Sequence, residues 1–155
     1  MLPEHLSNGL CSLNPDQDRL AFSVFLTLDD EGRPVASRFG KSIIRSKLRL
    51  TYEQALALIE TRPGMRSPVP GVGVEVMEQV HRLHALAQQM RRRRFDQYAL
   101  DLDLPESQVV IGANGLIEDI RRVENDFSHQ MIEECMVAAN EAVDRHLSGR
   151  KWALI

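Results

Sequence analysis

The sequence is poor in cysteine and in aromatic residues, and it has no long apolar run. Cys11 and Cys135 are its two cysteines, and they form no CxxC pair. A zinc site or a redox motif is therefore not expected, and both thiols should be reduced. No apolar run approaches the ~20 residues that span a membrane, and the N-terminus lacks the basic-then-apolar pattern of a signal peptide. We therefore expect a cytoplasmic protein without membrane contact.

The charge balance also lacks a strong excess of either sign. Lysine and arginine number 19 against 22 aspartates and glutamates, which gives a formal net charge of −3. A self-sufficient RNA-binding domain is usually basic, so this balance counts mildly against that role. The length of 155 residues suits one compact domain or a subdomain.

The first half of the chain predicts a β-hairpin and a short helix. Residues 1–45 are expected to form an irregular segment and then a hairpin, because turn formers crowd the start and two β-prone runs flank a polar loop. Helical spacing follows over residues 46–60, with Thr51 as a plausible N-cap. The density of proline and glycine predicts a loop over residues 61–73.

The second half predicts two amphipathic helices separated by strands. Apolar residues recur at helical spacing over residues 75–94 and again over 125–147. Residues 98–120 are expected to be strands, with a turn at Asn114-Gly115. The apolar face expected for the last helix consists of Ile132, Met136, Ala139, Val143 and Leu147. The order of elements does not alternate, so the predicted class is α+β, with β-hairpins packed against amphipathic helices.

Two acidic motifs resemble metal sites. Asp101 and Asp103 form a DxD, but residues two apart on a strand share one face, which solvent usually occupies. Glu78 and His81 have the ExxH spacing of di-metal helical bundles, but a second such pair is missing. The favoured interpretations are a solvated strand face for the first motif and, for His81 and His84, a place beside the polar face of a helix.

Asp126, Ser128 and His129 supply the residue types of a hydrolase triad. They lie within four positions at a predicted helix start, and no nucleophile elbow accompanies them. The favoured interpretation is a helix cap, made by Asn125 or by Asp126.

A run of four arginines, residues 91–94, ends the long predicted helix. Such a run can contact phosphates, or it can interact with the helix dipole while remaining solvated. The second interpretation is the default. By spacing alone, Tyr52 and Glu133 are ordinary residues, and Glu133-Glu134 is expected to be solvated.

Four strings of residues are more specific than any single motif. They are LPEHLSNGLCSLNP at 2–15, KLRLTY at 47–52, ALDLDLPE at 99–106 and NDFSHQMIEECMVAANE at 125–141. In this order and at this spacing the chain resembles the ribonuclease R/ribonuclease II family. The resemblance covers nearly all of residues 1–155, which would make the chain a partial RNB-type ribonuclease domain.

The resemblance implies a processive 3′→5′ exoribonuclease that releases nucleoside 5′-monophosphates. Single-stranded RNA would enter a channel by its 3′ end and reach a magnesium ion held by an aspartate cluster. The last bases would stack on aromatic side chains, and contacts to the ribose 2′-hydroxyl would favour RNA over DNA.

Three residues of this chain match RNA-binding positions of the family. Tyr52 matches a tyrosine that lies near the 3′-terminal nucleotides and sets the length of the final product. Glu133 matches a glutamate that contacts the terminal ribose. Leu102 stands where the family commonly has a phenylalanine that stacks on the terminal base, so weaker clamping of the base is expected.

The resemblance places the catalytic groups outside this sequence. The metal-binding aspartates of the family precede the first string, and an arginine that helps the metal site follows the last. We therefore expect no catalytic residue, no bound Mg²⁺ and no nuclease activity in this polypeptide alone. The alternatives are a non-catalytic RNA-binding or scaffolding module, and an unrelated metal enzyme built on Glu78 and His81. Exposed apolar surface is expected to favour self-association.

Overall fold

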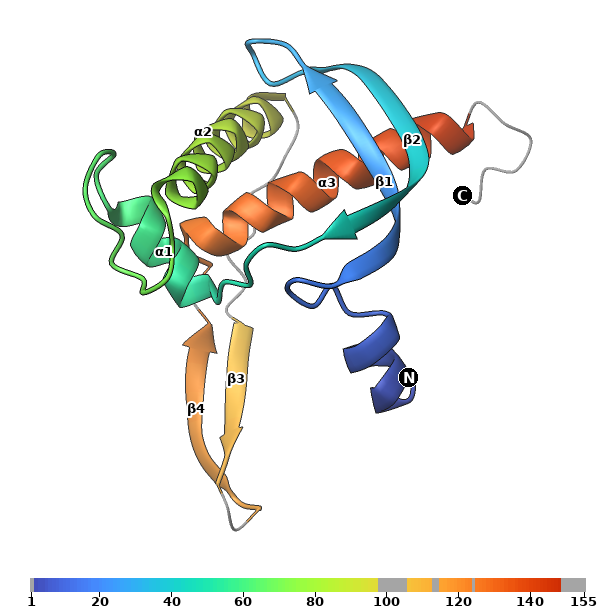
Figure 1. Cartoon of the computed structure of the whole chain (residues 1–155). Helices are drawn as coiled ribbons and strands as arrows, with labels where there is room; N and C mark the ends of the chain where they lie inside the picture. The colour runs from blue at the N-terminus through green and yellow to red at the C-terminus, as the bar shows by residue number, and fades with distance from the viewer. Residues whose placement is uncertain (1, 98–105, 113–114, 124, 149–155) are drawn as a thin grey trace.

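The computed structural model describes residues 2–97, 106–112, 115–123 and 125–148 (Figure 1). Within these residues the fold is α+β, as predicted, and comprises three α-helices, two antiparallel hairpins and a short π-type helical turn. In chain order the elements are η1 (His5–Leu10), β1 (Asp18–Leu28), β2 (Pro34–Arg45), α1 (Tyr52–Glu60), α2 (Val74–Gln97), β3 (Glu106–Ile111), β4 (Ile117–Val123) and α3 (Phe127–Ser148). The turn η1 lies within the segment that was expected to be irregular.

The first hairpin contacts the helices at its turn and along β1. Strands β1 and β2 pair antiparallel from Asp18↔Arg45 to Leu28↔Pro34, with a shift of register between Thr27 and Leu28. The turn glycine, Gly32, has φ +72°, which a residue with a side chain rarely adopts. Asp30 in the turn accepts a hydrogen bond on its carbonyl from Gln89 of α2. Further along, β1 contacts α3, so the hairpin crosses the helices as Figure 1 shows.

Helix α1 begins with a capping box. The hydroxyl of Thr51 accepts a hydrogen bond from the backbone N–H of Gln54 at 3.2 Å, and the side chain of Gln54 accepts one from the N–H of Thr51 at 2.9 Å. Both donors would otherwise be unpaired at the helix start. Thr51 is therefore the N-cap that the sequence predicted, and it fixes Tyr52 as the first residue of the helix.

The segment between α1 and α2 is a loop that contributes to the core. No helix or strand lies within residues 61–73. Its Val69 is buried together with Leu58 of α1 and Met77 of α2. The loop therefore supplies the side chain that fills the space between the two helices, which a count of prolines and glycines does not reveal.

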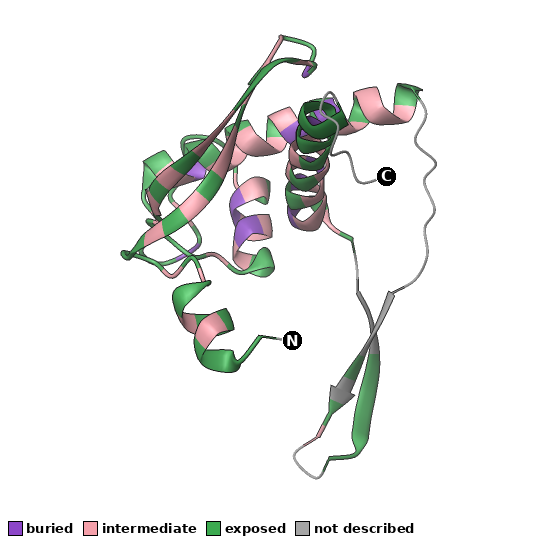
Figure 2. Cartoon of the chain, turned by 90° about the vertical axis from the view of Figure 1, so that its right-hand side faces the viewer, coloured by how far each residue is buried: buried purple, intermediate pink, exposed green. Residues whose placement is uncertain are grey.

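Helix α3 packs on α1 and α2 through a face that differs from the expected one. The buried residues of α3 are Ser128, Met131, Glu134 and Ala142. The expected apolar face is wrong for this structure, because Ile132, Met136, Val143 and Leu147 are exposed. Helical periodicity identifies an apolar stripe, but it does not say which stripe faces the neighbouring helices. Figure 2 shows the partly buried side of α3 next to the other helices.

The second hairpin extends away from the helices (Figures 1 and 2). Strands β3 and β4 pair antiparallel from Glu106↔Val123 to Ile111↔Ile117. Gly115, with φ +76°, closes the described part of the turn. The strand expected before residue 106 lies outside the described residues. Among the helices that the structure describes, none is long and apolar enough to cross a membrane.

Candidate functional site

The side chain of Tyr52 lies flat on the imidazole of His129. The two ring centroids are 3.9 Å apart and the planes differ by 14°. Tyr52 begins α1 and His129 lies in the first turn of α3, so the contact joins two segments far apart in the sequence. Tyr52 remains 45% exposed. One face of its ring is therefore covered by protein while much of the side chain reaches solvent.

Asp126 fixes the imidazole of His129. One oxygen of its carboxylate, Oδ1, accepts hydrogen bonds from the backbone N–H of Ser128 at 2.9 Å and of His129 at 3.2 Å. The same oxygen accepts from the hydroxyl of Ser128 at 2.6 Å and lies 2.9 Å from Nδ1 of His129. Asp126 is therefore the N-cap of α3, which decides between the two predicted caps and accounts for the triad-like motif.

The ionisation of Asp126 determines which nitrogen of His129 carries a proton. Burial acts to raise the pKa of this carboxyl, but the hydrogen bonds from Ser128 and His129 outweigh it and lower the pKa to about 2. At neutral pH the carboxylate is ionised and can only accept hydrogen bonds. The Nδ1 atom of His129 must therefore be the donor, which leaves Nε2 free of a proton whenever the ring is neutral.

Glu133 lies one helical turn beyond His129 on the same side of α3, because residues four apart on a helix are neighbours. The two predicted RNA-binding residues, Tyr52 and Glu133, are thus linked through His129, which stacks on the first and lies one helical turn before the second. We call this the Tyr52–Glu133 surface, defined by Tyr52, His129 and Glu133. Leu102, the third predicted residue, lies outside the described residues. His129 was missed as a partner of Tyr52, although its spacing from Glu133 offered a signal.

Two of the four arginines pair with the glutamates of α3. Nη2 of Arg94 lies 2.5 Å from Oε1 of Glu134 and 3.4 Å from Oε1 of Glu133, and Nη1 of Arg91 lies 3.6 Å from Glu134. Glu134 is only 3% exposed. Its hydrogen bond raises the pKa of Arg94. The solvated interpretation is therefore wrong for Arg91, Arg94 and Glu134, which join α2 to α3.

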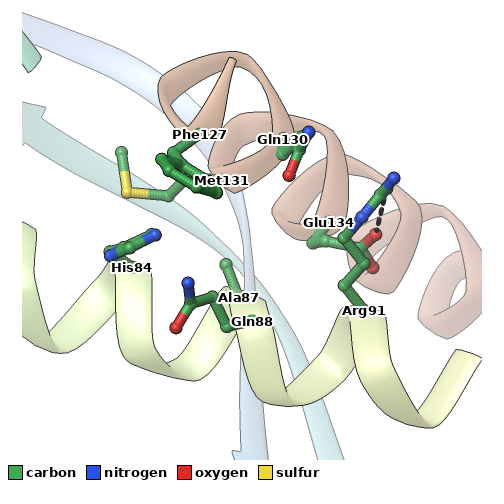
Figure 3. A pocket seen from close by; sticks show the side chains of 8 residues that line it. All are labelled: His84, Ala87, Gln88, Arg91, Phe127, Gln130, Met131 and Glu134. Carbon is green, nitrogen blue, oxygen red and sulfur yellow. Dashed lines mark ion pairs between the residues drawn. The ribbon is translucent and has the colours of Figure 1, made fainter. Parts of the chain in front are cut away.

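A shallow pocket lies between α2 and α3 (Figure 3). His84, Arg91, Phe127 and Glu134 are among its lining residues. Burial, together with the neighbouring His81, lowers the pKa of His84. His81 lies against α1, with Nε2 2.8 Å from the carbonyl oxygen of Leu58. Both histidines are thus at helix interfaces, and the expectation of a polar helix face was wrong.

The described residues do not form a magnesium site. Within the described ranges, no group of three or more histidine, cysteine, aspartate or glutamate side chains could hold a metal ion. Glu78 lies 3.6 Å from Arg82, and His81 faces a backbone carbonyl, so the ExxH pair is not arranged as a metal site. Asp101 and Asp103 lie outside the described residues.

Known proteins resemble the chain in both sequence and fold. The family model described as the RNB domain matches residues 1–155. Ribonuclease R of Aquifex aeolicus is 40% identical over 95% of this chain and 20% of its own length. The "DIS3-like exonuclease 2" of Schizosaccharomyces pombe is 33% identical over 96% of this chain and 17% of its own length.

A solved structure extends the similarity to the fold. Mycoplasma genitalium RNase R in complex with double-stranded RNA matches 99% of this chain and 26% of its own, with a TM-score of 0.84 and 29% identity. The chain spans about a fifth of the length of the curated relatives it matches. A match of the family model to every residue, supported by sequence and fold, shows that this chain belongs to the RNB-domain family that includes ribonuclease R.

Proposed function

We propose that the chain is part of a 3′→5′ exoribonuclease and that its Tyr52–Glu133 surface contacts the nucleotides at the 3′ end of single-stranded RNA. The observation that carries this proposal is the stacking of Tyr52 on His129, one helical turn from Glu133. His129 thus links the two residues that the family resemblance implies for RNA contact, although they lie 81 positions apart in the sequence.

The chemistry of this surface suits a terminal nucleotide. A base can stack on the exposed part of the Tyr52 ring, which is a contact that tolerates any sequence. The carboxylate of Glu133 can accept a hydrogen bond from a ribose hydroxyl, which distinguishes RNA from DNA. Its pairing with Arg94 at 3.4 Å helps to hold it in place. Together these groups would bind and orient the end of the strand.

We further propose that the intact enzyme uses Mg²⁺ and that this polypeptide alone does not hydrolyse RNA. The support is the resemblance, in which the metal-binding aspartates precede the first of the four strings. When bound, the ion would activate water and stabilise the charge of the in-line displacement. The residues described here would contribute binding and orientation. Cleavage into nucleoside 5′-monophosphates and processivity are likewise proposals about the whole enzyme.

Self-association of the isolated chain is a related proposal. The exposed residues Ile132, Met136, Val143 and Leu147 form an apolar stripe on α3. Apolar stripes of this kind associate in water. We expect light scattering to give a molecular mass that rises with concentration, whereas a strictly monomeric chain would contradict the proposal.

The binding proposal is tested with 5′-labelled oligoadenylate and the purified chain. Fluorescence anisotropy at low salt should detect binding that weakens as salt is added. The double variant Tyr52→Ala/Glu133→Ala should weaken binding at least about tenfold, since the lost stack alone contributes about 1–3 kcal/mol. Glu118→Ala, an exposed position on β4, is the control. Equal binding by the double variant and the wild type would contradict the proposal.

The same RNA tests the expected inactivity. With magnesium present, neither the wild type nor the double variant should shorten the strand. A ladder that shrinks from the 3′ end only with the wild type would overturn this expectation and would direct attention to Asp101 and Asp103. Shortening by both proteins would indicate a contaminating nuclease.

A further inference from the structure

We propose that His129 is a positioning residue for Tyr52, and that Asp126 fixes His129 in that role. The proposal rests on the function proposed above and adds two residues to it. Neither side chain is required to touch RNA. Their contribution would be to hold the Tyr52 ring at one angle, so that its open part is ready for a base before RNA arrives.

The stacking geometry is the first observation that supports this role. A separation of 3.9 Å and an interplanar angle of 14° place the two rings nearly parallel and in contact. A tyrosine at the first position of a helix can otherwise adopt several side-chain rotamers. The imidazole removes that freedom from one side only, and Tyr52 is still 45% exposed. Binding RNA then costs less side-chain entropy than it would with a mobile ring.

The anchoring of His129 is the second observation. Its backbone N–H and its Nδ1 atom both lie within hydrogen-bond distance of the same oxygen of Asp126, at 3.2 and 2.9 Å. The buried hydroxyl of Ser128 holds that carboxylate from another side at 2.6 Å. The orientation of the imidazole is therefore set by the start of α3. A rigid helix end thus determines the position of a ring that belongs to α1.

A second histidine on α3 provides a matched control. His146 packs on Phe39 of β2 with ring centroids 4.4 Å apart. It is also a histidine–aromatic contact on α3, but it lies at the opposite end of the helix from Tyr52. His146→Ala therefore removes an equivalent contact while leaving the Tyr52–Glu133 surface intact.

The test has two measurements on the complete chain. The first is the NMR spectrum of the tyrosine rings without RNA. The chain has two tyrosines, Tyr52 and Tyr98, and a Tyr52→Phe variant assigns the signals. Ring currents from His129 should displace the Tyr52 signals in the wild type. The second measurement is the dissociation constant for oligoadenylate at low salt.

The variants test the imidazole of His129 and the carboxylate of Asp126 separately. In His129→Ala the Tyr52 signals should move toward those of an unconstrained tyrosine, and RNA binding should weaken about 3- to 10-fold. His129→Phe keeps an aromatic platform and should restore much of the affinity. Asp126→Asn keeps a good N-cap but loses the carboxylate, so it should give an intermediate result. His146→Ala should leave both measurements unchanged.

Several outcomes would overturn the proposal. Unchanged Tyr52 signals in His129→Ala would mean that the imidazole does not restrain the ring. Displaced signals with unchanged affinity would mean that the restraint does not serve RNA binding. If Tyr52→Ala itself binds RNA as tightly as the wild type, the proposed function fails. That failure is distinguishable, because the signals in His129→Ala would still report on the contact between the rings.

Discussion

The two faces of α3 differ in a way that the sequence alone does not suggest. The inner face, turned toward α1 and α2, mixes apolar and polar side chains: Ser128, Met131, Glu134 and Ala142. The outer face carries the apolar stripe of Ile132, Met136, Val143 and Leu147, and its Met136 is 59% exposed. Two of the four residues of α3 that are buried within this chain are thus polar, whereas the stripe left exposed is apolar.

The difference follows from what each face must do. The inner face carries groups that are satisfied only by particular partners, since Ser128 donates to Asp126 and Glu134 accepts from Arg94. Buried polar groups that are fully paired select one arrangement of neighbours, whereas an apolar stripe packs on many surfaces. In α3 the polar groups on the inner face therefore fix the position of the helix, and with it the position of His129 beneath Tyr52.

Removing the buried charge of Glu134 should have the largest effect on the inner face. Glu134→Gln leaves Arg94 and Arg91 without their shared anion, and breaking a buried pair costs about 3–5 kcal/mol. We expect the free energy of unfolding in urea to fall by about 3 kcal/mol. Glu133→Gln, its more exposed neighbour, should cost less than about 1 kcal/mol. If the two substitutions lowered the free energy of unfolding equally, the burial of Glu134 would not contribute to stability as described.

Truncating a methionine on each face gives the second comparison. Met131 is 5% exposed, so Met131→Ala should lower the free energy of unfolding by about 2–4 kcal/mol. Met136→Ala on the outer face should change it by less than about 0.5 kcal/mol. Thermal and urea unfolding of the two variants would check this. A larger loss for Met136 would mean that the outer face is buried in solution, for instance in a dimer.

Acid should destabilise the start of α3 by protonating Asp126, the partner of Ser128 on the inner face. Its pKa in the folded chain is about 2, below the ordinary value of 3.8. Ionised Asp126 therefore stabilises the folded chain above about pH 4. This contribution to the free energy of unfolding, roughly 2 kcal/mol at most, is lost as the pH falls toward 2. Between pH 5 and pH 2, the free energy of unfolding in urea should fall less steeply for Asp126→Asn than for the wild type. Parallel pH profiles would contradict this assignment.

The cap of α1 should show the smallest effect. Thr51→Ala removes one half of the capping box and should cost about 1 kcal/mol of unfolding free energy. Thr51→Ser keeps the hydroxyl and should restore most of it. If Thr51→Ala matches the wild type in urea unfolding, then packing rather than capping fixes the first turn of α1.

Local patterns in the sequence were sufficient to predict the fold class and the cap of α1, and they narrowed the cap of α3 to two residues. The helix expected over residues 46–60 begins only at Tyr52. Thr51 and Asp126 carry short polar side chains directly before periodic apolar runs, and both are N-caps. Capping depends on neighbours in the sequence, so it can be inferred without knowing the tertiary structure. The resemblance to the family singled out Tyr52 and Glu133, which composition and spacing alone did not distinguish.

Contacts between distant segments could not be predicted in the same way. The pairing of Arg94 with Glu134 spans 40 positions, and an arginine run near a helix end is equally compatible with solvent. The stack of Tyr52 on His129 depends on how α1 meets α3. The buried face of α3 was wrongly predicted for the same reason. Periodicity describes one helix at a time, whereas burial depends on the elements around it.

The buried valine of the loop between α1 and α2 has a consequence for how this family can vary. Val69 is fixed between Leu58 and Met77, while Gly64 and Met65 on the same loop are exposed. Insertions are tolerated where the backbone is exposed and unpaired with the core. Extra residues near Gly64 would therefore lengthen the loop harmlessly, whereas an insertion next to Val69 would pull that side chain out of the core. Length variation among relatives should accordingly gather on the α1 side of Val69.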